Sequence, residues 1–419
     1  MLIYIHVPFC RQRCHYCAFQ AQALGRDVEP VSSQAMRDYV DTLLMELAIW
    51  GDRLAGRRVE TIFFGGGTPS LLPPKIVGII LDRLHKIFTI EDNAEISLEA
   101  NPESLKGTLL PSQYLACGIN RLSLGLQSLD GDMLRVLGRV HKAQDSLNSL
   151  QAAREAGFVN IGVDLMWGLP GQSVRHWLQS LKDVVRLAPE HISAYGLTLE
   201  EGTVLERQCR QGLFTLPPER DLNIMFVEGA AYLESQGYLQ YEISNFSRMG
   251  YQCRHNLGYW QGLDYLGLGP SATSTIDNKR WTNPAHQKAW TEKIAKGQVA
   301  GHEEVLTPLI RVLEMIMLSL RTVRGLSLKR YKDMTGHDFL VDHRRMVQAL
   351  HENALIRIRQ GWLRLTPSGM VVSNAIISNL FEQTKKVLTE PLPPLTAEPV
   401  QSLRVEDAPD VRAVVWPKA

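Results

Sequence analysis

The stretch LIYIHVPFCRQRCHYCAF (residues 2–19) decides how the rest of the chain is interpreted. Its first six residues are rich in apolar and β-branched side chains, which predicts a short β-strand over 2–7. Three cysteines follow at once, Cys10, Cys14 and Cys17, in the spacing Cys-x3-Cys-x2-Cys, and Phe19 stands two positions after the third. A strand that leads directly into three clustered thiols predicts a metal-binding loop.

Two kinds of metal site can be built around this loop. A structural zinc site needs four ligands, usually from two cysteine pairs. No second pair follows in the sequence, so His6 or His15 would have to complete such a site. A [4Fe–4S] cluster normally takes four thiolates, so three of them leave one iron without a protein ligand. S-adenosylmethionine (SAM) can chelate that iron through its amino and carboxylate groups. The spacing favours the cluster, and zinc is the alternative.

The composition is that of a globular protein with two or three domains: 419 residues, 45% of them hydrophobic and 21% charged. The formal net charge of +1 gives no general attraction to nucleic acid. No stretch reaches the roughly 18 consecutive apolar residues of a membrane helix, and the first ten residues lack the basic region of a signal peptide. Half of the six cysteines crowd into one loop, unlike a disulfide scaffold. We therefore expect a cytoplasmic location.

The first two hundred residues alternate β-rich runs with amphipathic stretches of helical periodicity. Strands are predicted over 2–7, 59–64, 94–100, 120–126, 160–167 and 190–197, and helices over 36–50, 74–88, 145–157 and 173–187. Such alternation predicts an α/β fold with a parallel sheet. Six units fall short of the eight that close a full barrel, so we expect a partial (β/α)6 barrel with an open side. Its active face would be formed by the loops after the strands.

Beyond the barrel (1–205), three further units are expected. Residues 206–300 form a smaller α+β region, with a helix near 218–237 and an aromatic, glycine-rich segment that contains HNLGYW (255–260). Residues 301–386 show helices followed by a hairpin near 354–369, an order typical of winged-helix domains. A structural or docking role is favoured there over DNA binding, because basic and acidic residues are interleaved. The Pro-rich tail, 387–419, is expected to be disordered.

Several polar residues stand where the predicted strands end. Three glycines, 65–67, follow the second strand, and such a turn lets a ligand approach the backbone closely, although it can also be a simple tight turn. Glu99 ends the third strand and needs a partner such as a ribose hydroxyl or an amino group, unless solvent hydrates it. Gln127 ends the fourth strand, and Arg139 follows it. Asp164 lies inside the apolar fifth strand, which indicates either a polar barrel interior or a buried structural hydrogen bond.

Taken together, these stretches resemble the radical SAM enzymes, and within them the family of oxygen-independent coproporphyrinogen III dehydrogenases (HemN-like). The motifs are YIHVPFCRQRCHYCAF, GGGTPSLL, EANPES, NRLSLGLQS, GRVH, DLMWGLPGQ, EISNF and HNLGYW, which cover roughly residues 2–272, with looser similarity to about 380. The resemblance implies that Cys10, Cys14 and Cys17 hold a [4Fe–4S] cluster. It also implies a set of SAM contacts: Tyr4, Gly66, Gly67, Thr68, Glu99, Gln127, Arg139 and Asp164. Some family members bind a second SAM, and whether this chain does is open.

One position separates subgroups of that family. The porphyrinogen dehydrogenases carry a further cysteine two positions after the third, where this chain has Phe19. The chain therefore looks like the heme-chaperone subgroup, HemW, which implies that it binds heme as cargo and delivers it to apo-hemoproteins. His255 is the candidate heme ligand, near Cys253, and a hydrogen-bonded structural histidine is the alternative. Competing functions are a coproporphyrinogen III dehydrogenase, or another radical SAM enzyme that modifies tetrapyrroles, and a zinc-stabilised nucleic-acid-binding protein.

Overall fold

The computed structural model of the chain describes residues 1–25, 33–105, 110–299, 303–389 and 392. Nearly all of the tail that is expected to be disordered lies outside the described residues.

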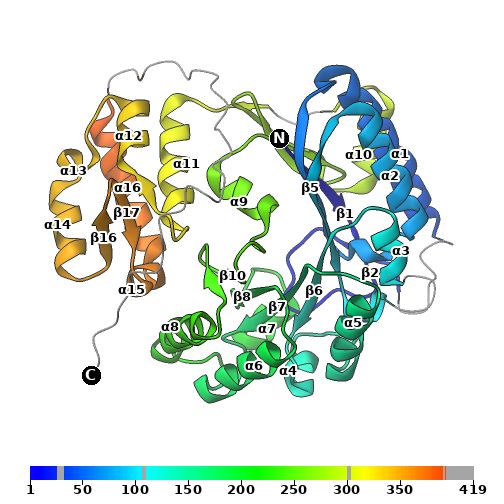
Figure 1. Ribbon diagram of the computed structural model, residues 1–419, viewed down its shortest axis with the longest axis horizontal. Coiled ribbons are helices and arrows are strands. Elements are labelled where there is room, and N and C mark those ends of the chain that lie inside the picture. The colour runs from blue at the N-terminus through cyan, green and yellow to red at the C-terminus, as the bar shows by residue number, and fades with distance from the viewer. Residues whose placement is uncertain (26–32, 106–109, 300–302, 390–391, 393–419) are drawn as a thin grey trace.

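A single sheet of twelve strands organises most of the molecule (Figure 1). From edge to edge its strands are β14 (Glu304–Val305), β13 (Lys279–Thr282), β12 (Thr273–Ile276), β11 (Tyr265–Leu268), β1 (Leu2–Val7), β4 (Arg58–Gly66), β5 (Thr89–Ala100), β6 (Arg121–Gln127), β7 (Ile161–Trp167), β8 (His191–Gly196), β10 (Asn245–Ser247) and β9 (Leu239–Gln240). β1, β4, β5, β6, β7 and β8 run parallel to their neighbours in this order. These are the six strands predicted from the sequence, so the α/β fold with a parallel sheet is confirmed.

The sheet curves without closing. Within the described residues its two edge strands, β14 and β9, do not pair with each other, so the expected partial barrel is confirmed. The sequence did not predict β11, a seventh parallel strand that pairs with β1 from Leu2↔Tyr265 to Ile5↔Leu268. Nor did it predict that β9, β10 and β12 to β14 extend the same sheet with antiparallel strands. The unit boundaries at residues 205 and 300 stay a prediction.

Helices cover the convex side of the sheet (Figure 1). They are α1 (Gln34–Leu54), α2 (Pro74–Ile87), α3 (Pro111–Ala116), α5 (Ala143–Glu155), α6 (Val174–Arg186), α8 (Glu219–Ser235) and α10 (Gln287–Ala295). β1 shows how the two faces differ: Ile3, Ile5 and Val7 are fully buried in the main core, while Tyr4 and His6 alternate with them and point to the concave side. The concave side is therefore where polar and aromatic side chains gather.

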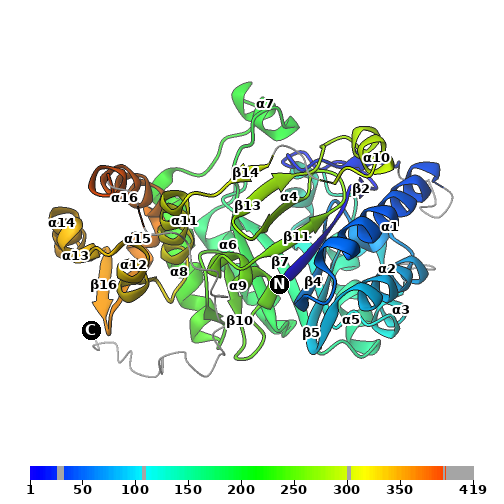
Figure 2. The same ribbon diagram turned by 90° about the horizontal axis from the view of Figure 1, so that it is seen from above.

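Three more helices lie near the concave side and the loops after the strands. α4 (Gly131–Val136) and α7 (Val204–Arg210) follow β6 and β8, and α9 (Arg254–Gln261) packs against β4. Figure 2 shows α7 standing out from the rest of the molecule. The amide of Leu205, in α7, donates a hydrogen bond to the carbonyl oxygen of His15 at 2.8 Å, so this helix begins against the cysteine loop.

The C-terminal residues build a second hydrophobic core from Val312 to Leu388. Its elements are α11 (Pro308–Leu320), β15 (Leu326–Ser327), α12 (Leu328–Thr335), α13 (Phe339–Asp342), α14 (Arg344–Glu352), β16 (Ile356–Arg359), β17 (Trp362–Leu365), α15 (Pro367–Val371) and α16 (Ser373–Val387). The predicted hairpin is β16–β17, which joins β15 in a three-stranded sheet. This winged-helix-like unit lies on the opposite side of α9 from α1 and α2 (Figure 1).

Candidate functional site

The three clustered cysteines lie on one loop directly after β1. Cys10, which ends the short strand β2 (Phe9–Cys10), and Cys14 and Cys17 are half-buried free thiols. β3 (Gln22–Ala23) pairs with β2 and closes the loop, and the Leu24 amide donates to the Cys10 carbonyl at 2.9 Å. Burial raises the pKa of Cys10 to about 11, partly offset by a hydrogen bond with Thr68, and it also raises the pKa of Cys17. Thiolates on this loop therefore need positive charge from a bound metal.

The donor groups suit a cluster better than a single zinc ion. Within the described residues, the thiols do not converge on one point with a further His, Cys, Asp or Glu, as the ligands of one ion would. In a [4Fe–4S] cluster each thiolate binds a different iron, so such convergence is not required. Both histidines that would have to complete a zinc site have other partners. His6 bonds to Tyr4 and to the Gln20 carbonyl, and His15 Nδ1 lies 2.9 Å from the carbonyl oxygen of Val136.

The glycine turn after β4 supports the cysteine loop through its backbone. The amide of Gly67 donates to the carbonyl of Val7 at 2.8 Å, and the amide of Thr68 donates to that of Phe9 at 2.7 Å. A Cβ on Gly67 would lie 2.6 Å from the Phe9 carbonyl oxygen, and Gly66 has a φ of +112° that L side chains rarely adopt. The turn therefore admits only glycine at these two positions, and it joins the loop to the ends of β4 and β5.

Two carboxyl groups face the concave side from alternate strands. Glu99, at the end of β5, accepts a hydrogen bond from the Gly66 amide at 3.2 Å. Burial, and then the negative charge of Asp164, raise the pKa of Glu99 to about 8. Asp164, in β7, accepts from the Ser123 hydroxyl at 3.4 Å, and burial raises its pKa as well. Two partly buried carboxyl groups that interact electrostatically favour a ligand that brings hydroxyl or ammonium donors.

Arg139 connects the cysteine loop to the ends of β5 and β6. Its Nη2 donates to Asn101 Oδ1 at 2.7 Å and to the Gly125 carbonyl at 2.9 Å, and its Nη1 lies 3.4 Å from Cys14 Sγ. Asn101 Nδ2 in turn donates to the Thr68 hydroxyl at 3.0 Å. The sequence analysis missed Asn101, although its place two residues after Glu99, beyond a strand end, was a usable signal. Hydrogen bonds to a cluster sulfur tune its reduction potential, so this guanidinium suits a cluster environment.

The structure thus brings most of the predicted site residues to the carboxyl ends of β1 and β4 to β7. Gln127 ends β6 in a left-handed conformation with a φ of +63°, a strained state for a residue other than glycine. Tyr4 lies nearer the centre of β1, with its hydroxyl 3.0 Å from His6 Nδ1. That these residues contact SAM stays a prediction.

His255 lies away from the strand ends, near the amino end of β4, with its ring centroid 6.4 Å from that of Tyr4. Its Nδ1 is 2.7 Å from the Thr61 hydroxyl, and its amide donates to Glu95 Oε1 at 3.1 Å. The ring packs between Phe63 and Tyr259, with centroids 5.0 and 4.8 Å away. Burial lowers the pKa of His255 to about 3, and its Nε2 is enclosed, with no hydrogen-bond partner in the described part of the chain. Its role as a heme ligand stays a prediction.

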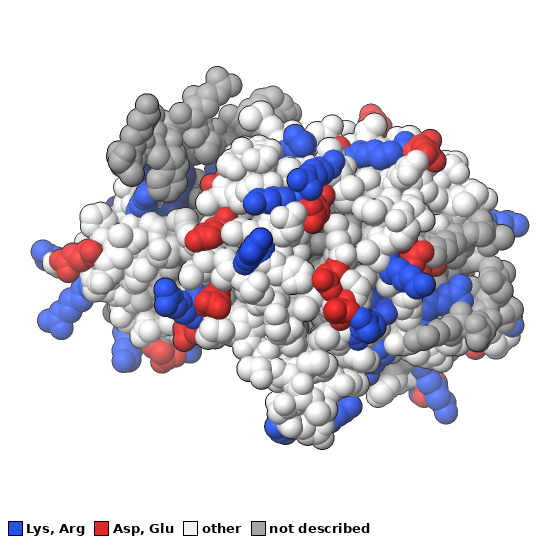
Figure 3. Space-filling model, turned by 90° about the horizontal axis from the view of Figure 1, so that it is seen from below, with Lys and Arg blue, Asp and Glu red and all other residues white. Residues whose placement is uncertain are grey.

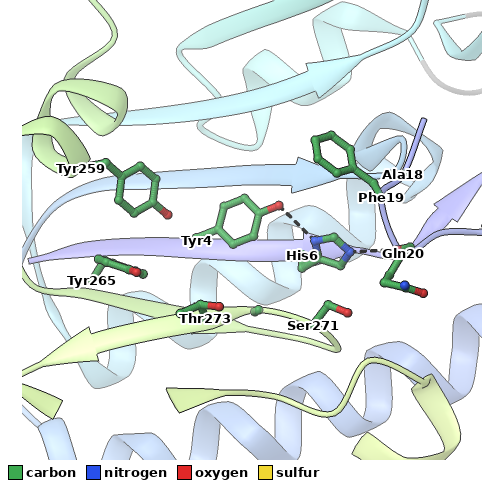
Figure 4. Close-up of a pocket in the computed structure, with 10 residues that line it drawn as sticks. Tyr4, His6, Ala18, Phe19, Gln20, Tyr259, Tyr265, Ser271 and Thr273 are labelled. Carbon is green, nitrogen blue, oxygen red and sulfur yellow. Dashed lines mark hydrogen bonds between the residues drawn. The ribbon is translucent and has the colours of Figure 1, made fainter. Parts of the chain in front are cut away.

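A cavity of about 460 Å³ opens on the concave side, beside the cysteine loop (Figure 4). Aromatic rings dominate its lining. The lining residues are Tyr4, His6, Ala18, Phe19, Gln20, Tyr259, Tyr265, Ser271, Ala272 and Thr273. They come from β1, the end of the cysteine loop, α9, β11 and the start of β12. The sequence analysis considered His6 only as a zinc ligand and did not single out Tyr259 or Tyr265, although it noted the aromatic richness of their segment.

The surface and the helices add two observations. On the face drawn in Figure 3, Lys and Arg side chains are interspersed with Asp and Glu, without a continuous area of one sign. Among the described helices, none is both long enough and apolar enough to cross a bilayer.

Family models match two parts of the chain. The Radical SAM superfamily model matches residues 4–184, and the HemN C-terminal domain model matches residues 306–372. The heme chaperone HemW of Bacillus subtilis is 34% identical over 375 residues, which cover 89% of this chain and 97% of that protein. The chain belongs to the HemW family of radical SAM proteins.

A second relative and a solved structure are also similar to this chain. The mitochondrial "Radical S-adenosyl methionine domain-containing protein 1" of Bos taurus is 33% identical over 404 residues, 93% of this chain and 89% of that protein. The solved structure of coproporphyrinogen III oxidase (HemN) from Escherichia coli has a TM-score of 0.76 and covers 92% of this chain and 90% of its own, at 23% identity. That likeness shows a shared fold. Membership of the radical SAM superfamily implies a [4Fe–4S] cluster and SAM as cofactors.

Proposed function

We propose that this HemW-family protein is a heme chaperone that binds heme and delivers it to apo-hemoproteins. The observation that carries the proposal is the aromatic cavity, which lies beside a loop with three free cysteines. The match to heme chaperone HemW of Bacillus subtilis along nearly the whole length of the chain supports it. Aromatic rings offer a porphyrin both apolar area and stacking surfaces. The free thiols also favour work in a reducing compartment such as the cytoplasm.

In this proposal Cys10, Cys14 and Cys17 hold a [4Fe–4S] cluster whose fourth iron binds SAM. The reduced cluster would supply a single electron to bound SAM. The chain's own residues position that molecule and keep water away from it. The turn at Gly66 and Gly67 lets SAM approach the backbone.

The remaining predicted contacts supply polar partners for SAM. Glu99 and Asp164 accept from its hydroxyl or amino groups, Gln127 and Thr68 offer further hydrogen bonds, and Tyr4 contributes an aromatic face. Arg139, already bonded to Asn101 and Gly125, keeps positive charge next to Cys14.

The second candidate is a coproporphyrinogen III dehydrogenase or another radical SAM enzyme that modifies a tetrapyrrole. The shared fold with HemN of Escherichia coli favours it. The residue after the cysteine loop weighs against it, because Phe19, 65% exposed at the mouth of the cavity, stands where the dehydrogenases carry a further cysteine.

Anaerobic reconstitution tests the proposal. We expect four irons per chain, an electron paramagnetic resonance (EPR) signal of the reduced cluster that changes on addition of SAM, and a Soret band on addition of hemin. Coproporphyrinogen with reductant should give no protoporphyrinogen, and conversion would overturn the chaperone function. Cys14→Ser should lose the cluster. Cys209→Ser is the matched control, because Cys209 lies on α7, outside the loop, and should leave the iron content unchanged.

A further inference from the structure

We propose that the heme cargo binds in the aromatic cavity of Figure 4 and that His6, rather than His255, is its axial ligand. The inference rests on the proposed function and specifies the site at which heme is held. It follows from where the two imidazoles lie, what encloses each of them and what each ring nitrogen contacts.

His6 lines the cavity from the concave face of β1, in a fixed orientation. Its ring packs against Gly66, where an added Cβ would lie 2.6 Å from Nδ1. Nε2 lies 3.1 Å from the carbonyl oxygen of Gln20, which can only accept, so Nε2 carries the proton. Nδ1 therefore accepts from the Tyr4 hydroxyl at 3.0 Å. Both partners line the same cavity, as the dashed lines of Figure 4 show.

These hydrogen bonds allow His6 to become a metal ligand. Only one proton has to move, from Nε2 to Nδ1, and the charge of the imidazole does not change. When Nε2 binds the heme iron, its hydrogen bond to Gln20 is released and the imidazole carries its proton on Nδ1. Nδ1 then donates to the Tyr4 oxygen, which accepts. A ligating histidine normally gives its other N–H to such a partner, which sets its tautomer and ring orientation. Gln20 is exposed at the end of the cysteine loop, so its carbonyl can be displaced without opening the core.

His255 neither lines the cavity nor offers a ring nitrogen that heme can reach. It is not among the residues that line the cavity, and its Nε2 is enclosed in the described structure. The ring of Phe63 stacks on one side at 5.0 Å, and the ring of Tyr259 meets it edge-on at 4.8 Å. A planar macrocycle can reach that nitrogen only after these aromatic rings move. His255 instead fixes α9 against β4 through Thr61, and Tyr259 on the same helix lines the cavity.

Apart from Tyr4, which lines the cavity, the predicted SAM contacts are left free by its position. Those contacts lie mainly along β4 to β7, whereas the cavity lies along β1, β11 and β12. Tyr4 stands on the border of the two regions. Phe19, on the cavity rim, presents an exposed ring that can stack on the macrocycle, so the position that differs from the dehydrogenases becomes a heme contact.

The test compares hemin binding by cluster-loaded full-length variants: wild type, His6→Ala, His255→Gln and His85→Ala. The glutamine keeps a hydrogen-bonding group opposite Thr61, and His85 is an exposed residue on α2 that serves as the matched control. Ligation is followed by the EPR spectrum of ferric heme and by the iron–histidine band in the resonance Raman spectrum of ferrous heme. Iron content and thermal unfolding verify that each variant is folded and loaded.

We expect His6→Ala alone to lose the imidazole signature and to regain it when free imidazole is added. Tyr4→Phe should keep the signature but bind hemin on the order of tenfold more weakly, because it loses the partner of Nδ1. A wild-type signature in His6→Ala, or its loss in His255→Gln, would overturn the assignment while leaving heme binding intact. Failure of the loaded wild-type protein to bind hemin at all would overturn the proposed function and this inference together.

Discussion

Replacing Gly67 with alanine is expected to separate the glycine turn from the cysteine loop. The new Cβ would lie 2.6 Å from the carbonyl oxygen of Phe9 and 2.9 Å from that of Val7, well inside the 3.4–4 Å range of ordinary van der Waals contact. Both opposing atoms belong to the backbone, so no side chain can rotate to relieve the clash. The backbone after β1 must therefore move, and Cys10 moves with it.

The cost of this change follows from the same contacts. Overpacking in a tight site costs about 1–3 kcal/mol. The movement also weakens two backbone hydrogen bonds, Gly67 to Val7 at 2.8 Å and Thr68 to Phe9 at 2.7 Å, each worth about 1 kcal/mol net. We expect Gly67→Ala to lower the free energy of unfolding of the barrel by about 2–4 kcal/mol.

Urea unfolding of the metal-free protein measures this loss, and iron per chain after reconstitution measures the effect on cluster loading. Gly131→Ala is the matched control, because no atom lies within 4 Å of the Cβ added at the first residue of α4. Its stability should stay within about 0.5 kcal/mol of wild type. If Gly67→Ala matched Gly131→Ala in both stability and iron content, the proposed support of the loop by the turn would be wrong.

Three further perturbations test other contacts of the site. Burial raises the pKa of Glu99 from its ordinary 4.5 to about 8, so the free energy of unfolding of the ligand-free protein should fall as the pH rises between these values. Glu99→Gln should flatten this slope, which urea titrations from pH 5 to 8.5 measure. Arg139→Gln should reduce iron content and abolish the SAM-dependent EPR change. Arg135→Gln, on the exposed face of α4, should alter neither. Equal iron content in the two variants would contradict a supporting role for Arg139. Thr61→Val should leave His255 Nδ1 unpaired and cost about 1–3 kcal/mol in thermal or urea unfolding. Unchanged stability in Thr61→Val would mean that this hydrogen bond does not hold α9 to β4.

Local sequence patterns were sufficient to predict the first six parallel strands and four of the helices between them, α1, α2, α5 and α6, but not the short helices α3 and α4. The strands carry dense apolar runs, and the helices repeat apolar residues every three or four positions, so both signals lie within one element. The same holds for the hairpin β16–β17 and for α8. β11 was missed because its four residues, YLGL, acquire their role only by pairing with β1, which lies more than 250 positions away. The short antiparallel strands at both edges were missed for the same reason.

The sequence by itself determined the chemistry of the cysteine loop and the residues at the strand ends. Three thiols, a glycine turn, and polar residues that interrupt apolar strands such as Asp164 in β7 are visible without any structure. What only the tertiary structure decided is which groups meet. Arg139 lies beside Cys14, and Asn101 lies between Thr68 and Arg139. Both His6 and His255 are buried, but only His6 lines the cavity. Whether an imidazole lines the cavity depends on rings that come from β1, β4, α9 and β11. Such long-range packing leaves no periodic signal in the order of the residues.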